Sequence, residues 1–342
     1  MNKELKVLLI LIVSVLVTYW FIEPYAHSKL SPHVAPVNYD FSQGDALSTK
    51  DNIDMAQKAL ENAKSRNDEK AIAAAEADLS VAKENQDKAT LFWNEVNQID
   101  FSKGDASTGA ETFINAGCTA CHGVEAAGLP APMDGATASD AYGVNPPDLS
   151  TAGYLYDEKF LAAIIKDPVM ALKLGHKFGD ETPFPMPGFF GLGGDINQEL
   201  ADIVAYLKSI APKEMENSAV FDNACSRCHD VKYDNKAMTS NIDALSKYMG
   251  STPPDLSMMI RSKRASYLHE FINDPQKRLP GTSMPRVGLN QQAEDQVVAY
   301  LENVGDSKKS EREKTTIWIM IYFAILAVFA GLWKKKVWEK LH

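Results

Sequence analysis

Apolar residues are concentrated at the two ends of the chain. Residues 5–22 form an apolar run interrupted only by Lys6, and residues 317–333 form a second run of 17 residues. A helix needs about 17–25 mostly apolar residues to cross a bilayer. We therefore expect transmembrane helices within residues 1–24 and 313–336. The first is expected to remain attached as a signal anchor, because no small-residue cleavage site follows it.

The segment between Thr49 and Asn97 has a different pattern and is rich in Ala, Glu, Lys, Asp and Asn. Its apolar residues keep heptad spacing in two series that are out of phase across residues 65–68. Such a break predicts two helices packed as an antiparallel hairpin. The two series are Ile53, Ala56, Leu60 and Ala63, then Ile72, Ala75, Leu79, Ala82, Ala89, Trp93 and Val96.

Short matching segments border this hairpin. Residues 40–46 (DFSQGDA) return as residues 100–106 (DFSKGDA), so the hairpin looks inserted between duplicated flanks. We assign it to a segment of residues 25–98. It is expected either to contact another subunit or to space the following domains from the membrane.

The rest of the chain contains an internal repeat. The string PPDLS begins 28 residues after Cys118 and again 28 residues after Cys225, and an Asp-Pro pair begins 49 residues after each of them. An amphipathic stretch precedes each Asp-Pro pair, and the last helix of each copy carries the string Ala-Tyr-Leu. The constant registers predict a duplicated helical domain, with copies at residues 99–213 and 214–306, each of a normal size for one core.

Each copy contains one Cys-x-x-Cys-His motif, at residues 118–122 and 225–229. This is the signature of covalent haem c attachment, in which two thiols bond to the haem and the following histidine binds its iron. The alternative is a single zinc site made of all four cysteines of the chain, which would leave both histidines unexplained. We therefore expect two covalently bound haem c groups, attached through Cys118, Cys121, Cys225 and Cys228, with His122 and His229 as iron ligands.

A haem iron with one histidine needs a sixth ligand or an open position for a substrate. Met186 and Met284 each precede a proline in a loop ahead of the last helix of a repeat, where a thioether ligand would raise the reduction potential. We expect these two to be axial ligands, whereas most of the 12 methionines fill core gaps. Met186 lies 68 residues after the first cysteine of its motif and Met284 only 59, so the first repeat has nine extra residues around positions 175–181. His176 in that segment is the rival ligand for the first haem.

The chain between its apolar ends is acidic. The total formal charge is −10, of which residues 1–22 carry +1 and residues 313–342 carry +3, leaving −14 on residues 23–312. This charge argues against binding to nucleic acid. It suits electrostatic attraction of a basic soluble partner such as a small cytochrome c, or is simply a solvated surface.

Lysines mark the side of the membrane on which each end lies. Lys3 precedes the first apolar run, and residues 334–336 are three lysines directly after the second. The excess of basic residues in cytoplasmic segments predicts that both termini are cytoplasmic. The domains between them would then lie in the periplasm, outside the inner membrane of a Gram-negative bacterium, on the side where haem c is attached.

These features resemble a known family. The haem motif at residues 118–122, the PPDLS and Met-Pro strings and a C-terminal anchor are similar to the cytochrome c1-like subunit of cytochrome bc complexes, the quinol–cytochrome c reductases. The usual member has one haem. Two tandem domains resemble the dihaem subunits of epsilonproteobacterial bc1-type complexes, whose halves look like the tandem cytochrome c4 type. The resemblance covers residues 99–334 and leaves the hairpin out.

The expected fold is mainly α, with two tandem class I cytochrome c domains, a helical hairpin and two transmembrane helices. The resemblance implies a relay of electrons from the Rieske iron–sulfur protein to a soluble or oxidase-bound cytochrome c, in a complex that also contains cytochrome b. The chain would be an electron carrier, and the complex around it would be the enzyme. The resemblance also implies that Pro147 and Pro254 lie beside the iron-binding histidines and orient their outer hydrogen bonds.

Three other functions fit parts of the pattern. The dihaem subunit of a cbb-type haem–copper oxidase is also tandem and membrane-anchored, but its anchors normally lie on the N-terminal side. A dihaem enzyme such as a peroxidase needs an open haem position, and a methionine in both repeats argues against one. The third is a stand-alone membrane carrier, which would not require two membrane anchors and a helical arm.

Overall fold

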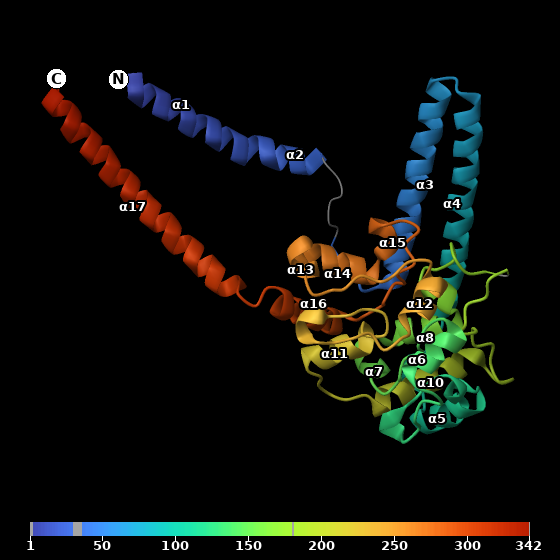
Figure 1. Cartoon of the computed structure of the whole chain (residues 1–342). Coiled ribbons are helices and arrows are strands. Elements are labelled where there is room, and N and C mark those ends of the chain that lie inside the picture. Colours follow the sequence, from blue (N-terminus) through green and yellow to red (C-terminus); the bar gives the residue numbers. More distant parts are fainter. Residues whose placement is uncertain (1–2, 30–35, 180, 342) are drawn as a thin grey trace.

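The two apolar ends form long helices that leave the body of the molecule (Figure 1). The computed structural model describes residues 3–29, 36–179 and 181–341. At the N-terminus, α1 (Lys3–Val17) continues through a π-helical turn, η1 (Thr18–Ile22), into α2 (Glu23–Lys29). At the C-terminus, α17 (Lys309–Leu341) begins before the expected residue 313 and ends beyond residue 336.

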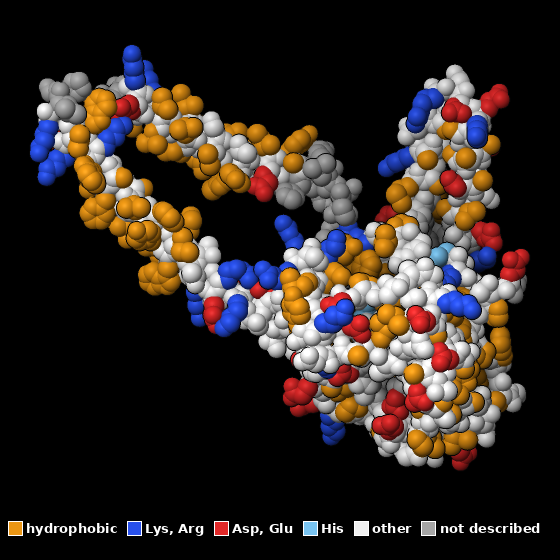
Figure 2. Space-filling model, in the orientation of Figure 1, with side chains coloured by type: hydrophobic (Ala, Val, Ile, Leu, Met, Phe, Trp, Pro, Cys, Tyr) orange, Lys and Arg blue, Asp and Glu red, His pale blue; other side chains and the backbone are white. Residues whose placement is uncertain are grey.

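Both ends are long and apolar enough to cross a membrane. The candidate spans are Lys3–Ala26, with a mean hydropathy of 2.5, and Lys309–Lys340, with a mean hydropathy of 2.2, and neither is buried against the rest of the chain. Figure 2 shows apolar side chains along the uncovered length of both helices. Both ends of the chain therefore form a candidate membrane span, as expected from the sequence.

The expected helical hairpin consists of α3 (Phe41–Ser65) and α4 (Glu69–Val96), which project from the body (Figure 1). The turn between them has Asn67 in the left-handed region, with φ of 53°, and Asp68 caps α4 by accepting a hydrogen bond from the backbone N–H of Ala71. The apolar heptad positions are all buried or half-buried along the seam between the helices.

The hairpin begins at Phe41 rather than at Thr49, so the first flank is part of its first helix. The Asp40 carboxylate accepts a hydrogen bond from the backbone N–H of Gln43 and starts α3 there. In the second flank, residues 101–103 form only a 3₁₀ turn, η2 (Phe101–Lys103), and the chain then bends at Gly104. A Cβ at Gly104 would lie 2.5 Å from a backbone oxygen of the last helix of the repeat. The flanks are therefore alike in sequence but different in conformation.

Two successive sets of short helices form the body. The first repeat contains α5 (Ala106–Asn115), η3 (Cys118–Ala120), η4 (Glu125–Ala127), α6 (Gly135–Tyr142), α7 (Ala152–Leu155), α8 (Glu158–Lys166), α9 (Pro168–Ala171) and α10 (Ile196–Ile210). The second contains α11 (Asn217–Ala224), η5 (Lys232–Asp234), α12 (Ile242–Met249), α13 (Met259–Ser262), α14 (Ala265–Asn273), α15 (Pro275–Arg278) and α16 (Gln291–Gly305). The described residues form no strand, only an isolated β-bridge at the same register of each repeat.

The nine-residue difference between the repeats is visible in their backbone hydrogen bonds. The N–H of Phe189 donates to the carbonyl of Ile165, and the N–H of Val287 donates to the carbonyl of Ile272. Both donors follow a Met-Pro pair by the same number of residues, and both acceptors precede an Asp-Pro pair. In both repeats the segment after the Met-Pro pair therefore bonds back to the helix before the Asp-Pro pair. The extra residues of the first repeat lie in the loop between these two points.

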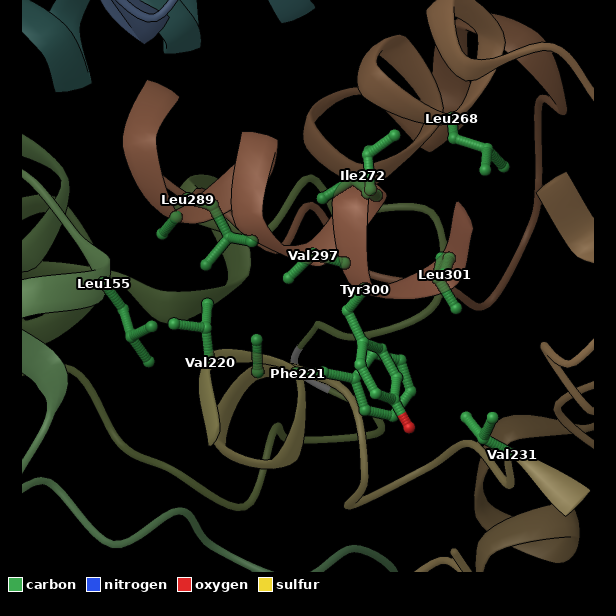
Figure 3. Close-up of a cluster of buried hydrophobic side chains, with 13 residues drawn as sticks. Leu155, Val220, Phe221, Val231, Leu268, Ile272, Leu289, Val297, Tyr300 and Leu301 are labelled. Carbon is green, nitrogen blue, oxygen red and sulfur yellow. The ribbon is translucent and has the colours of Figure 1, made fainter. Parts of the chain in front are cut away.

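In each repeat the helix before the haem motif packs against the last helix. Phe113 contacts Tyr206 with ring centroids 5.6 Å apart, and Phe221 contacts Tyr300 at 4.6 Å. In the first repeat α5 and α10 approach closely at Gly109, which has no side chain to hold them apart. Figure 3 shows the second core, built around Phe221 and Tyr300.

The two repeats share a packed interface. Leu155, from α7 of the first repeat, is buried in the core of the second (Figure 3). The side-chain amide of Asn290 donates to the carbonyl of Tyr154 at 2.7 Å, and the N–H of Asn290 donates to the carbonyl of Leu155 at 2.9 Å. This interface sets the position of one repeat relative to the other.

The close contact between α5 and α10 predicts the outcome of adding one methyl group. A Cβ at position 109 would lie 1.9 Å from the carbonyl oxygen of Asp202. Overpacking of this kind costs about 1–3 kcal/mol, which outweighs the roughly 1 kcal/mol that Gly→Ala contributes in an open helix. Gly109→Ala is expected to lower the midpoint of thermal unfolding followed by circular dichroism.

The matched control is Gly44→Ala, which lies within α3 and would make only ordinary contacts, the nearest at 3.9 Å. That variant is expected to unfold at the same temperature or slightly higher. An increase in the midpoint for Gly109→Ala would contradict the observed packing.

Candidate haem sites

Both Cys-x-x-Cys-His motifs form a tight turn that brings the histidine back towards the first cysteine. The N–H of His122 donates to the carbonyl of Cys118 at 3.0 Å, and the N–H of His229 donates to the carbonyl of Cys225 at 3.0 Å. All four cysteines are free and half-buried. The two motifs therefore share this turn hydrogen bond although only the cysteines and the histidine are common to both.

The histidine rings are oriented by backbone carbonyls. Nδ1 of His122 lies 2.8 Å from the carbonyl oxygen of Pro147, and Nδ1 of His229 lies 2.8 Å from that of Pro254. A carbonyl oxygen can only accept, so each Nδ1 carries the proton and each Nε2 keeps its lone pair. This tautomer and this second hydrogen bond are typical of a metal-binding histidine.

The PPDLS strings hold the turn that follows each motif. In the first repeat the Asp148 carboxylate accepts from the N–H of Glu125 at 3.0 Å, and the Ser150 hydroxyl accepts from the N–H of Ala126 at 3.0 Å. The second repeat has both contacts too. The Asp255 carboxylate accepts from the N–H of Lys232 at 3.0 Å, and the Ser257 hydroxyl accepts from the N–H of Tyr233 at 3.1 Å.

These carboxylates and hydroxyls are missing from the site residues expected from the sequence. The signal that points to them is the equal spacing of PPDLS from the cysteines in both repeats. Only the coordinates show that this spacing brings Asp and Ser to two backbone N–H groups, so that the string positions the proline carbonyl and the turn together.

Burial sets the protonation of the motif residues. It lowers the pKa of His122 and of His229, which keeps both rings neutral near pH 7, the form that binds a metal. Burial also raises the pKa of Cys225 to about 12 and raises the pKa of Cys118 and of Cys228. Burial therefore favours the neutral thiol at these three cysteines.

The four cysteines do not combine into one metal site. Among the described residues, no three His, Cys, Asp or Glu side chains are grouped so as to hold a metal ion. This arrangement argues against the four-cysteine zinc site. In contrast, two thiols and one neutral histidine in each motif are the complete protein contribution to a covalently attached haem on its proximal side.

Two buried polar atoms beside the second motif have no hydrogen-bond partner, Nε of Arg227 and the hydroxyl of Tyr248. Arg227 lies between the two cysteines of the motif, and Tyr248 lies near Cys228. Both atoms are donors, and the carboxylates of a haem are acceptors. The second motif therefore offers a haem two unpaired hydrogen-bond donors in addition to its cysteines and histidine.

Arg227 also connects the two motifs. Its Nη1 donates to the carbonyl of Asn145 at 3.3 Å, two residues before the proline that holds His122. Its positive charge adds to burial in lowering the pKa of His122. Next to this contact, the side chain of Asn145 donates to the hydroxyl of Thr239 at 3.2 Å. The two candidate haem sites are therefore neighbours across the interface between the repeats.

The candidate sixth ligands lie in comparable places. Met186 and Met284 are half-buried, on irregular segments between α9 and α10 and between α15 and α16. His176, the rival ligand, is exposed on the extra loop of the first repeat. Neighbouring residues of that loop pack on the second repeat instead, with the ring centroids of Phe178 and Tyr248 5.4 Å apart.

Comparison with known proteins gives a family. The family model described as Cytochrome c matches the chain twice, over residues 106–211 and 216–305. The cytochrome c of Tetrahymena pyriformis is 28% identical over 117 residues, which cover 33% of this chain and 95% of that protein. A solved chain described as "Hyperthermophilic respiratory Complex III" is 21% identical and covers 37% of this chain and 75% of its own, with a TM-score of 0.29.

Separate sites predict that each haem can be removed alone. Replacing Cys118 and Cys121 together by alanine is expected to halve the haem absorbance per protein after denaturation in alkaline pyridine. The matched variant replaces Cys225 and Cys228 in the same way and is expected to give the same value. Loss of all covalent haem in either variant, or of none, would contradict one attachment site per repeat.

The position of the two methionines predicts a spectral change. Met186→Leu and Met284→Leu should each remove part of the far-red sulfur-to-iron absorption of the oxidised protein and lower one reduction potential, because thioether ligation favours the reduced iron. Met55→Leu is the control, since Met55 is exposed on α3. If neither variant differs from the control, the two methionines are not the ligands.

Proposed function

The chain belongs to the cytochrome c family, and we propose that it is a membrane-anchored electron carrier with two haem c groups, one in each repeat. Members of this family bind haem c covalently. The observation that carries the proposal is the repeated geometry of the two motifs, in which each histidine is neutral and hydrogen-bonded to a proline carbonyl.

The residues proposed for the two sites act as attachment points, iron ligands and positioning groups. When bound, each haem supplies a one-electron iron couple, whose potential depends on the axial ligands and on the polarity around them. Cys118, Cys121, Cys225 and Cys228 attach the haems, His122, Met186, His229 and Met284 bind the irons, and Pro147 and Pro254 orient the histidines. No group in this set is required to make or break bonds in a substrate.

A relay between the two sites is supported by the interface between the repeats. Arg227 of the second motif bonds to Asn145 in the loop that holds His122 of the first. Leu155 and Asn290 pack the repeats into one body rather than two domains on a flexible linker. Such an arrangement holds the two sites in a fixed relation, which electron transfer between two cofactors requires.

We further propose that the chain works in a quinol–cytochrome c reductase. It would accept electrons from the Rieske iron–sulfur protein beside cytochrome b and deliver them to a soluble or oxidase-bound cytochrome c. The support is the likeness of its haem motif, PPDLS and Met-Pro strings to cytochrome c1-like subunits, together with a C-terminal helix able to span a membrane. The acidic region between the ends suits a basic cytochrome c as acceptor.

The proposed location follows from the two terminal helices. Both would cross the bacterial inner membrane, with the lysines before the first apolar run and after the second on the cytoplasmic side. The body and the hairpin would lie in the periplasm, where the sites are accessible to soluble electron carriers.

Purification of the full chain from its native membrane in mild detergent tests the complex. We expect cytochrome b and a Rieske protein to co-purify, identified by mass, and the haems to be reduced when a quinol is added. A copper-containing oxidase subunit in their place would assign the chain to a haem–copper oxidase. Recovery of the chain alone, still with two haems, would indicate a stand-alone carrier.

A further inference from the structure

The loop that carries Met284 is attached to the base of the hairpin by a buried ion pair. Arg286 follows Met284 by two residues and is only 2% exposed. Its Nη1 donates to the Asp45 carboxylate at 3.0 Å, its Nη2 donates to the other oxygen of the same carboxylate, and its Nε donates to the carbonyl of Asn273 at 3.0 Å. The guanidinium is therefore fixed on three sides.

Asp45 belongs to the first turns of α3, far away in the sequence, and it is also buried. Nε1 of Trp93, on α4, donates to its carboxylate at 2.9 Å, and Nζ of Lys173 lies 3.1 Å from it. Burial alone would raise the pKa of Asp45, but the charges of Arg286 and Lys173 outweigh burial, and this pKa lies well below its usual range. The carboxylate is therefore ionised and fully paired.

Aromatic packing adds to this attachment. The guanidinium of Arg286 lies over the ring of Phe41, the first residue of α3, at 5.0 Å from the ring centre. Phe41 in turn contacts Phe160 of α8 at 5.2 Å. Gly288, with φ of +79°, passes so close to Phe160 that a Cβ there would lie 1.9 Å from the ring. Both ends of the segment after Met284 are thus held against the hairpin and the first repeat.

Among the described residues of the first repeat, this ion pair has no counterpart after Met186. Gly188 stands two residues after Met186, where the second repeat has Arg286. A Cβ at Gly188 would lie 2.6 Å from the carbonyl oxygen of Lys166, which leaves no room for a side chain. Phe190, two residues further on, is 88% exposed. In the described part of the chain, the hairpin therefore forms an ion pair with the loop after Met284 and none with the loop after Met186.

We propose that the base of the hairpin positions Met284 as a ligand of the second haem, with Asp45 and Arg286 as the positioning residues. This inference rests on the proposed function, because it takes Met284 to be an iron ligand. It assigns a role to the inserted hairpin, which lies outside the two segments matched by the cytochrome c family model. It also makes the two haems inequivalent, with the second one held in the more rigid ligand set.

The test is Asp45→Asn in the full chain, with the potentials of both haems and the far-red absorption band as readouts. Loss of a negative charge near an iron would by itself raise the potential. Loosening of the Met284 loop, which loses its ionic anchor, would instead lower the potential of one haem and weaken the band. We expect the second outcome, with the potential of the other haem unchanged.

Two further variants keep this test interpretable. Asp202→Asn makes the same chemical change at a carboxylate of α10 that is only 4% exposed and bonds within the first repeat, to the N–H of Asp105 and to Gln198, and it is expected to leave the potential assigned to the second haem unchanged. Trp93→Phe removes one hydrogen bond from Asp45 without changing its charge, and it should lower the same potential by a smaller amount. If Asp45→Asn does not fold, Trp93→Phe alone tests the proposal.

Met284→Leu distinguishes an error in the ligand assignment of Met284 from an error in the positioning role of the hairpin. If Met284→Leu lowers one potential but neither Asp45→Asn nor Trp93→Phe does, the positioning role of the hairpin is wrong and the ligand assignment stands. If Met284→Leu changes nothing, the ligand assignment itself is wrong, and the positioning role fails with it. A rise in potential for Asp45→Asn would show that its charge acts on the iron directly, which also overturns the proposal.

Discussion

The hydrogen bond between each motif histidine and a proline carbonyl is the constraint on which the rest of this structure depends. It decides which ring nitrogen carries the proton and therefore which one can bind iron. The bond is possible only because PPDLS returns to the motif, where Asp148 and Asp255 accept from backbone N–H groups of the following turn. The helices before and after this arrangement pack on each other through Phe113 and Tyr206 in one repeat and their counterparts in the other. The fold thus holds two equal proximal sites.

The two sites differ in what surrounds them. Arg227 introduces one positive charge at the boundary between the motifs, and the first motif has Ala120 in that position. The extra loop of the first repeat covers part of the second, whereas the hairpin base contacts the loop of Met284 through Arg286. The two motifs therefore orient their histidines alike, while the repeats differ at their boundary and in the contacts of the Met284 loop. Such differences are a means of giving two haems of the same type different potentials.

Much of this arrangement follows from the sequence because it depends on local pattern. The cysteine motifs, the registers of PPDLS and Asp-Pro, the heptad seam of the hairpin and the two apolar ends each predict an element that the structure contains. The start of the hairpin at Phe41 was not predicted, because Gly44 and the likeness to residues 100–106 favour a turn there. The partners that make residues 41–45 helical and buried, Phe160 and Arg286, are distant in sequence. The Arg227–Asn145 contact and the place of Leu155 in the second core depend in the same way on tertiary packing.

The intact mass of the full-length chain, purified from its native membrane and denatured, tests the central claim most directly. Covalent haem survives denaturation, so the account predicts the mass of the polypeptide plus two haems. The mass of the polypeptide plus one haem, or of the polypeptide alone, would contradict it, because at least one motif would then have no cofactor although both orient their histidine in the same way.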